Sequence, residues 1–221
     1  MTEAEWLVAT ELTPMLAFLR GKASDRKLRL FGLDCCRLVI ALLDPRGLKA
    51  VGAAERYADG LCSPEELEAA RLVANEAFCE FDDRQGSESA ANAVESLCHA
   101  EGLSDLLNDV ARETAALSMY SQPQHLKRAT RRIRRLNQCR HLRDIFGNPF
   151  RPVAFSPAWR TDTAVSLARQ MYESRQFGAM PILADALQDA GCDNDGVLNH
   201  CRGDGAHVRG CWVVDLVLGK E

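Results

Sequence analysis

The sequence contains no uninterrupted apolar run near the ~18 residues that a membrane-spanning helix needs, so no transmembrane segment is predicted. The opening stretch, MTEAEWLVATEL, is acidic and has neither a basic region nor a small-residue cleavage site, unlike a secretory signal peptide. We therefore expect a soluble, cytoplasmic protein with no membrane partner. In that compartment the nine cysteines are expected to be reduced thiols or metal ligands rather than disulfides.

The sequence also lacks the motifs of common enzyme classes. It has no Gly-rich phosphate loop, dinucleotide fingerprint or hydrolase nucleophile elbow. The adjacent acids Asp82-Asp83 and Glu65-Glu66 do not face each other on a helix and have no histidine beside them. No complete catalytic site is therefore predicted, and a non-enzymatic role is favoured.

The composition is ordinary for a soluble globular protein, with 47% hydrophobic and 26% charged residues over 221 positions. A chain of this length buries enough surface to hold a core without disulfides. Its net charge of −4 gives no general attraction to nucleic acid or to membranes.

Helical signals follow one another along almost the whole chain, and no strand pair or fixed-period repeat is evident. Helix starts are predicted at Thr13 (with Pro14 at the first helical position), at Ser24, and at Ser63 with Glu66 in a capping box. The helix from Ser24 is expected to reach Asp44, with a buried face of Leu28, Phe31, Cys35, Leu38 and Leu42. Further helices are expected over 47–59, 87–100, 103–119 and 123–146, then in TDTAVSLARQMYESRQF, PILADALQDAG (closed by Gly191), DNDGVLNHCRG and GCWVVDLVLG.

One segment differs from the rest of the chain in composition. This segment, GNPFRPVAFSPAWRTD, contains three prolines, a glycine and the aromatic residues Phe150, Phe155 and Trp159. Prolines at this density block a helix, so we expect an extended connector whose rings pack on the helices. The predicted fold is all-α: a multi-helix bundle of about six to eight helices over residues 1–146, then a connector and a small helical C-terminal unit over 147–221. The two parts could also form one continuous domain, because the second is marginal alone.

Several sequence strings carry a family resemblance: LRDIFGNPFRP, the following PAW, LADALQDAGCDN, HCRG and HVRGCWVVDLVLGKE, together with the opening MTEAEWL…PMLAFLRGKASDRKLRLF…CCR. In these strings the chain resembles a large paralogous family of uncharacterised proteins from planctomycete bacteria. The resemblance implies a bacterial, cytoplasmic protein. It implies no activity, cofactor or catalytic residue.

The C-terminal segment concentrates sulfur and imidazole side chains: Cys192, His200, Cys201, His207 and Cys211. Thiolate and neutral imidazole are ligands that zinc prefers, and a helix over 207–211 would place His207 and Cys211 on one face. The spacing lacks the paired C-x2-C elements of common zinc sites, so burial of the cysteines and helix-end bonds from the histidines explain the pattern equally well.

Two other readings of this segment remain open. Cys201 or Cys211 could be a thiolate activated by a histidine, although the sequence indicates no third residue that would orient that histidine. The glycines of CRGDGAHVRGC, with Arg202 and Arg209, could instead hold an anion.

The predicted helix near residues 124–144 is strongly basic, with eight lysines and arginines and a single acid, Asp144. Its apolar stripe is predicted to dock on the bundle and to turn the basic residues outward. That stripe contains Leu126, Ala129, Ile133, Leu136, Cys139 and Leu142. The candidate contacts for nucleic acid or an acidic partner are Lys127, Arg128, Arg131, Arg132, Arg134 and Arg135. A solvated face balanced by acids on neighbouring helices is the simpler alternative.

The leading hypothesis from the sequence is a non-enzymatic interaction or regulatory module with a protein partner and no cofactor. The first alternative is a zinc-binding protein, structural or catalytic, that uses the C-terminal cysteines and histidines. The second is a nucleic-acid-binding protein that uses the basic helix.

Overall fold

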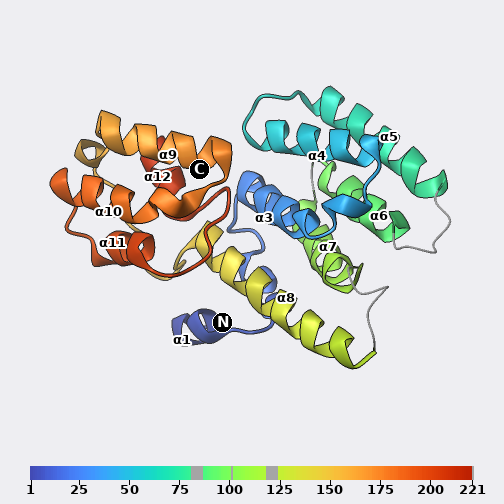
Figure 1. Ribbon diagram of the computed structural model, residues 1–221, viewed down its shortest axis with the longest axis horizontal. Coiled ribbons are helices and arrows are strands. Elements are labelled where there is room, and N and C mark those ends of the chain that lie inside the picture. The colour runs from blue at the N-terminus through green and yellow to red at the C-terminus, as the bar shows by residue number, and fades with distance from the viewer. Residues whose placement is uncertain (81–86, 101, 118–123, 221) are drawn as a thin grey trace. The chain divides into compact units, whose positions relative to one another are not determined.

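The computed structural model describes residues 1–80, 87–100, 102–117 and 124–220. Within these ranges the chain is all-α, as predicted, with twelve α-helices, three 3-10 helices and no strand (Figure 1). The α-helices are α1 (Glu3–Val8), α2 (Leu12–Leu19), α3 (Asp25–Arg37), α4 (Pro45–Ala58), α5 (Pro64–Glu80), α6 (Ser87–Leu97), α7 (Leu103–Leu117), α8 (Gln124–Phe146), α9 (Asp162–Ser174), α10 (Met180–Asp189), α11 (Asp195–Arg202) and α12 (Trp212–Leu218). The 3-10 helices are η1 (Ile40–Leu42), η3 (Pro157–Trp159) and η4 (Phe177–Ala179).

The chain divides into two compact units. The first contains Met1 and residues 8–139, and the second contains residues 2–7 and 140–221. The division therefore lies within α8, whereas the sequence predicted a boundary at residue 146, after this helix. The last turns of α8 belong to the second unit because their side chains bond there: the Arg143 guanidinium donates to the Trp6 carbonyl at 3.1 Å.

In the first unit α3 packs against α4, α6 and α7, and α5 packs against α4 and α6. α3 approaches its neighbours closely at Gly32, where an added Cβ would lie 2.2 Å from Leu97 and 2.8 Å from Leu107. Because protein cores are close-packed, these contacts leave no room for a larger residue at Gly32. The core of this unit is therefore built around α3.

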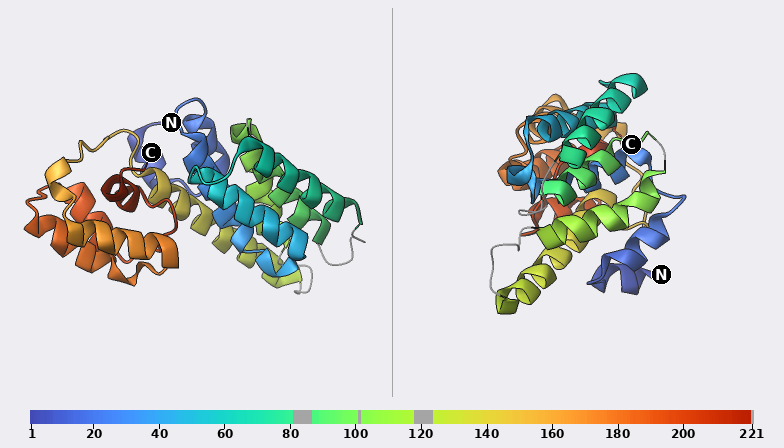
Figure 2. Two further views of the ribbon diagram at one scale, coloured as in Figure 1. Left: turned by 90° about the horizontal axis from the view of Figure 1, so that it is seen from above. Right: turned by 90° about the vertical axis from the view of Figure 1, so that its right-hand side faces the viewer.

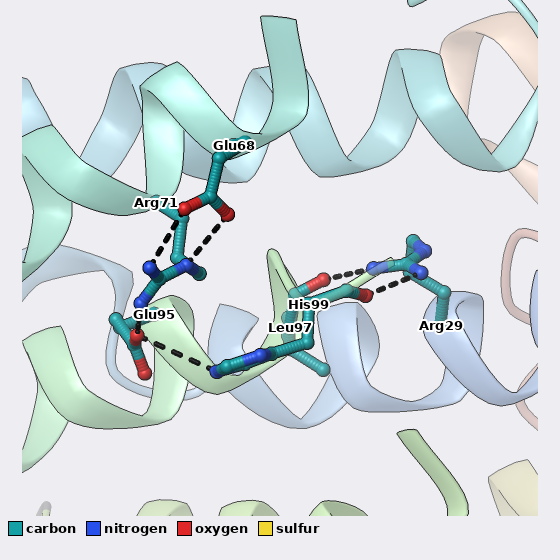
Figure 3. A network of polar contacts seen from close by, with 6 residues as sticks. All are labelled: Arg29, Glu68, Arg71, Glu95, Leu97 and His99. Carbon is teal, nitrogen blue, oxygen red and sulfur yellow. Dashed lines mark hydrogen bonds and ion pairs between the residues drawn. The ribbon is translucent and has the colours of Figure 1, made fainter. Parts of the chain in front are cut away.

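A buried arginine ties α3 to the end of α6 (Figure 3). The Arg29 guanidinium donates to the backbone carbonyls of Leu97 and His99, and it lies 4.8 Å from the centre of the Tyr57 ring. These bonds satisfy carbonyls that the end of a helix leaves open. Nearby, Arg71 of α5 bridges Glu68 of its own helix and Glu95 of α6, as Figure 3 shows.

The predicted helix starts are confirmed at two of the three positions. Ser24 accepts a hydrogen bond from the Lys27 N–H, and Ser63 exchanges bonds with Glu66 as a capping box. The prediction at Thr13 is wrong, because α2 begins at Leu12 after Glu11. Pro14 still falls in the first turn, where a helix does not need its missing N–H.

The helix predicted from Ser24 to Asp44 is shorter than expected. α3 ends at Arg37, and only the 3-10 turn η1 follows before Asp44. The β-branched residues Val39 and Ile40 follow the C-cap residue Leu38, and such residues lower helix propensity. Leu38 is 42% exposed as a result and does not belong to the buried face.

In the second unit α9 packs against α10 and α12, and α10 packs against α11 (Figure 2). Phe155 and Trp159 of the connector pack on the core of this unit, with ring centres 5.2 Å apart. The prediction that the connector rings pack on helices is therefore confirmed for Phe155 and Trp159. The prediction of a helix in GCWVVDLVLG is confirmed for Trp212–Leu218, which form α12. α10 ends in a Schellman motif, with Gly191 at φ 87° and the Cys192 N–H bonded to the Leu187 carbonyl.

The described residues include no helix that is long and apolar enough to cross a membrane. Eight cysteines are free thiols: Cys35, Cys36, Cys62, Cys98, Cys139, Cys192, Cys201 and Cys211.

Candidate metal centre

Four side chains of the second unit converge on one point: Asp144, His200, His207 and Cys211. One ligand atom from each lies within 4.8 Å of the other three. Asp144 Oδ1 is 2.7 Å from His207 Nδ1 and 3.1 Å from His200 Nε2. Cys211 Sγ is 3.2 Å from His200 Nε2 and 3.8 Å from His207 Nδ1.

Four different segments supply these side chains. Asp144 lies in the last turn of α8, and His200 lies in the last turn of α11. His207 belongs to the non-helical loop over 203–211, and Cys211 occupies the N-cap position of α12. The site therefore exists only when α8, α11 and α12 are folded together.

The loop that carries His207 is held by the same carboxylate that enters the cluster. The second oxygen of Asp144, Oδ2, accepts a hydrogen bond from the Val208 N–H at 2.8 Å. The Cys211 N–H then donates to the Val208 carbonyl at 2.9 Å, across a turn in which Gly210 has φ 95°. A positive φ of this kind favours glycine, so the turn brings His207 and Cys211 together without a helix.

The end of α8 is fixed close to the site by Gly147. This residue has φ 63°, and an added Cβ would lie 3.1 Å from Cγ of Trp212. Its carbonyl accepts a hydrogen bond from the Trp6 indole N–H at 3.0 Å. The Trp212 ring in turn contacts the His200 ring, with centres 5.1 Å apart. These contacts hold the aspartate and one histidine in place.

The cluster is largely withdrawn from solvent. The side chain of Asp144 is 5% exposed, that of His200 is 21% exposed, and Cys211 is fully buried. Burial alone would raise the pKa of Asp144, but hydrogen bonds with His200 and His207 outweigh it and hold that pKa below its usual value. Burial raises the pKa of the Cys211 thiol well above its usual range, although the Val213 and Val214 N–H groups oppose this.

The geometry differs from that of a thiol nucleophile activated by a histidine. In such a triad the imidazole uses one nitrogen for the nucleophile and the other for the carboxylate. Here the same nitrogen of His200, Nε2, faces both Cys211 Sγ and Asp144 Oδ1. Nδ1 of His207 likewise faces both groups. With the raised pKa of Cys211, this arrangement argues against nucleophilic catalysis. It places one possible ligand atom from each of the four side chains around a common centre.

The distances approach those of a tetrahedral zinc site, although three of the four close contacts are shorter. Zinc lies ~2.0 to 2.3 Å from nitrogen, oxygen and sulfur ligands, so the ligands of a tetrahedron lie roughly 3.3 to 3.8 Å apart. The four close contacts here range from 2.7 to 3.8 Å. Binding would require the closest pair, Asp144 and His207, to separate by about half an ångström. One acid, two imidazoles and one thiol also form a donor set that zinc accepts.

A cavity of about 320 Å³ lies against Asp144, His200 and His207, with Arg140 and Arg143 also on its wall. Such an opening provides the entry path that a metal site needs. Nε2 of His207 is buried and has no hydrogen-bond partner among the described residues. This departs from the outer-shell partner that a metal-bound histidine usually has.

The structure thus brings together three of the five predicted ligands, His200, His207 and Cys211. Cys192 and Cys201 are buried in the apolar core of the second unit, to which Cys211 also belongs, but neither is part of the four-residue cluster. Burial raises the pKa of Cys201 to about 12, as expected for a thiol that acts as a small apolar side chain. His207 and Cys211 do not share a helix, because residues 203–211 are not helical.

Sequence reasoning missed Asp144, which it treated only as the single acid of a basic helix. One signal could have identified it. The C-terminal end of a helix carries a partial negative charge and favours cations, so an acid in the last turn of α8 is out of place unless it binds something. That residue is also buried, and both of its oxygens have partners.

The structure gives less support to the hypothesis that Arg202 and Arg209 hold an anion together with the glycines of the loop. The Arg202 guanidinium donates to Asp185 at 2.9 Å and to Gln188 at 2.6 Å, so it is already paired. Arg209 lies 4.5 Å from the centre of the Tyr172 ring. Neither contact directs a guanidinium toward an anion held by the loop.

The basic helix is α8, and its arginines differ in environment. Arg128, Arg131, Arg132 and Arg135 are exposed, as predicted. Arg134 is not: its guanidinium is half-buried and donates to the Thr114 carbonyl at 3.3 Å. Ile133, assigned to the apolar stripe, is 57% exposed instead. The Lys127 side chain lies outside the described residues.

Comparisons with protein-family models, with curated proteins and with solved structures found no match for this chain. The resemblance to the planctomycete family stays a prediction. The functional argument therefore rests on the geometry of the metal centre and of α8.

Proposed function

We propose that this chain is a non-enzymatic helical module whose C-terminal unit is held together by a structural zinc ion. The ligands are Asp144, His200, His207 and Cys211. The observation that carries the proposal is the convergence of one nitrogen from each imidazole on the same carboxylate oxygen and the same sulfur.

The number and burial of the ligands favour a structural ion over a catalytic one. Structural zinc sites have four protein ligands, whereas catalytic sites keep one position for water or substrate. Four side chains from this chain would fill the tetrahedron. The ligands also come from α8, α11, α12 and the loop between the last two, so one ion would join every segment around the site.

A catalytic ion is the second candidate, and the cavity beside the cluster favours it. If Asp144 left the ion, a water molecule could enter from the side lined by Arg140 and Arg143. The Val208 N–H bond to Asp144 Oδ2 opposes this change, because release of the carboxylate would also release the loop. We therefore favour the structural role, within the bacterial, cytoplasmic setting expected from the sequence.

The test is the zinc content of protein purified without an affinity tag. We expect one zinc ion per chain, and loss of that ion in the Cys211→Ala variant. Cys201→Ala is the matched control, because it removes a buried thiol of the same unit that lies outside the cluster. Absence of zinc from the wild type, combined with no zinc uptake in competition with a chelating dye, would refute the proposal. So would equal zinc loss in both variants while both remain helical by circular dichroism.

A further inference from the structure

Four arginines form one stripe along α8: Arg128, Arg131, Arg132 and Arg135. Their spacing of three, four and seven residues places them on one face of the helix. They line a cavity of about 310 Å³ in the first unit, which is completed by Thr10, Glu11 and Leu136. We call this cavity the arginine groove.

The positive charge of the groove is poorly balanced. Glu11 is the only acid among the described residues that line it, and its Oε2 lies 3.7 Å from Arg135 Nη1. Both of these side chains are half-exposed or more. Arg128, Arg131 and Arg132 make no hydrogen bond or ion pair with any residue that the structure describes. Like charges at these spacings destabilise a helix. A bound anion would reduce the repulsion between these arginines and so stabilise α8.

The groove offers charge and little else. Among the described residues that line it, Leu136 is the only large apolar side chain and none is aromatic. Protein interfaces usually have buried apolar or aromatic anchors, and proteins that bind single strands usually stack the bases on aromatic rings. Guanidinium groups, in contrast, match phosphate oxygens with paired hydrogen bonds.

The length of the stripe indicates more than one phosphate. A rise of about 1.5 Å per residue separates Arg128 from Arg135 by about 10 Å along the helix axis. A chain of phosphates can pair with guanidinium groups along the whole of such a stripe, whereas a single phosphate is much shorter than the stripe. We propose that the arginine groove binds consecutive phosphates, either of a nucleic-acid backbone without regard to base sequence or of a small linear polyphosphate.

The experiment measures fluorescence anisotropy of a labelled single-stranded DNA of mixed sequence, with unlabelled tripolyphosphate as competitor, over a range of salt concentrations. The test variant is Arg131→Gln/Arg132→Gln. The control is Arg20→Gln/Arg112→Gln, which removes two exposed arginines of the same unit that are engaged in ion pairs with Asp105 and Asp109. Both variants change the net charge equally, and circular dichroism checks that both fold.

We expect the DNA affinity of the test variant to fall about tenfold and the slope of log K against log salt to decrease by roughly 1.4, as loss of two phosphate contacts implies. The control should stay within about twofold of the wild type, because arginines outside the groove make no phosphate contact. Displacement of the DNA by tripolyphosphate supports the phosphate chain as the shared ligand. Binding of DNA without displacement assigns the groove to the nucleic-acid backbone, and direct binding of tripolyphosphate without DNA binding assigns it to the small anion.

Three results would overturn the proposal. The first is no binding of either probe at low salt. The second is an equal loss in the test and control variants, which would reflect overall charge alone. The third is a polyglutamate peptide that competes as well as tripolyphosphate at equal charge, since it would show that the groove selects no phosphate.

Discussion

His207 Nδ1 lies 2.7 Å from Asp144 Oδ1, although 63 residues separate them in the sequence. The other oxygen of the same carboxylate binds the Val208 N–H, directly after that histidine. Asp144 therefore both enters the four-residue cluster and holds the loop that supplies a second member of it. This double role makes the aspartate the most informative residue to change.

The Asp144→Asn variant should bind zinc at least about tenfold more weakly than the wild type, because a neutral amide oxygen is a poorer ligand than a carboxylate. Competition with a chelating dye measures the affinity. Asp185→Asn is the matched control, since Asp185 is an exposed acid of the same unit outside the cluster. Equal affinities for the two variants would remove Asp144 from the ligand set.

Removal of zinc with a chelator should open the loop over 203–211. A ligand that binds only the folded state stabilises it, by about 4 kcal/mol when its concentration is a thousand times its dissociation constant. Hydrogen exchange should show faster exchange at the Val208 and Cys211 amides, which are bonded within the site. Amides of α3, in the other unit, should keep their rates. Unchanged exchange in the loop would contradict a structural role for the metal.

Gly147→Ala should destabilise the second unit by about 1 to 3 kcal/mol, because a non-glycine residue at positive φ is strained. The new methyl group would also press on Trp212. Gly191→Ala is a matched control: it has φ 87° but open space around the added Cβ. Urea unfolding should therefore show a larger loss for Gly147→Ala. Equal losses would mean that the packing of Trp212 at the end of α8 contributes nothing.

Asp44, the N-cap residue of α4, lies outside the metal centre and should make the free energy of unfolding depend on pH. Burial opposes ionisation of Asp44, but bonds from the Arg46 and Gly47 N–H groups and the Arg46 side chain hold its pKa below the ordinary 3.8. A lowered pKa in the folded state stabilises the protein above the unfolded pKa and ceases to do so as the pH falls through the folded value. Asp44→Ala should cost about 1 kcal/mol at neutral pH, less below about pH 4. A cost that stays constant from pH 7 to pH 3 would contradict this.

The sequence predicts the fold more completely than the site because helix signals are local. The capping box at Ser63 and Glu66 and the proline-rich connector are read from neighbouring residues, and both are confirmed. The end of α3 was misjudged because an apolar run continued the helical spacing beyond Arg37.

The metal centre is a long-range feature, and spacing along the chain could not resolve it. Five cysteines and histidines near the C-terminus looked equivalent, whereas the fold turns Cys192 and Cys201 into the apolar core. Their place is taken by an aspartate from α8. Only the packing of the last turns of α8 against the C-terminal segment, within the second unit, distinguishes a ligand from a packed thiol.

The measurement that tests the central claim most directly is X-ray absorption at the zinc edge of the metal-loaded protein. The geometry predicts a first shell of one sulfur at ~2.3 Å and three nitrogen or oxygen atoms at ~2.0 to 2.2 Å. Loss of the sulfur signal in Cys211→Ala, with its retention in Cys201→Ala, would identify the thiolate. A shell with two or more sulfurs, or with none, would contradict a site made by Asp144, His200, His207 and Cys211.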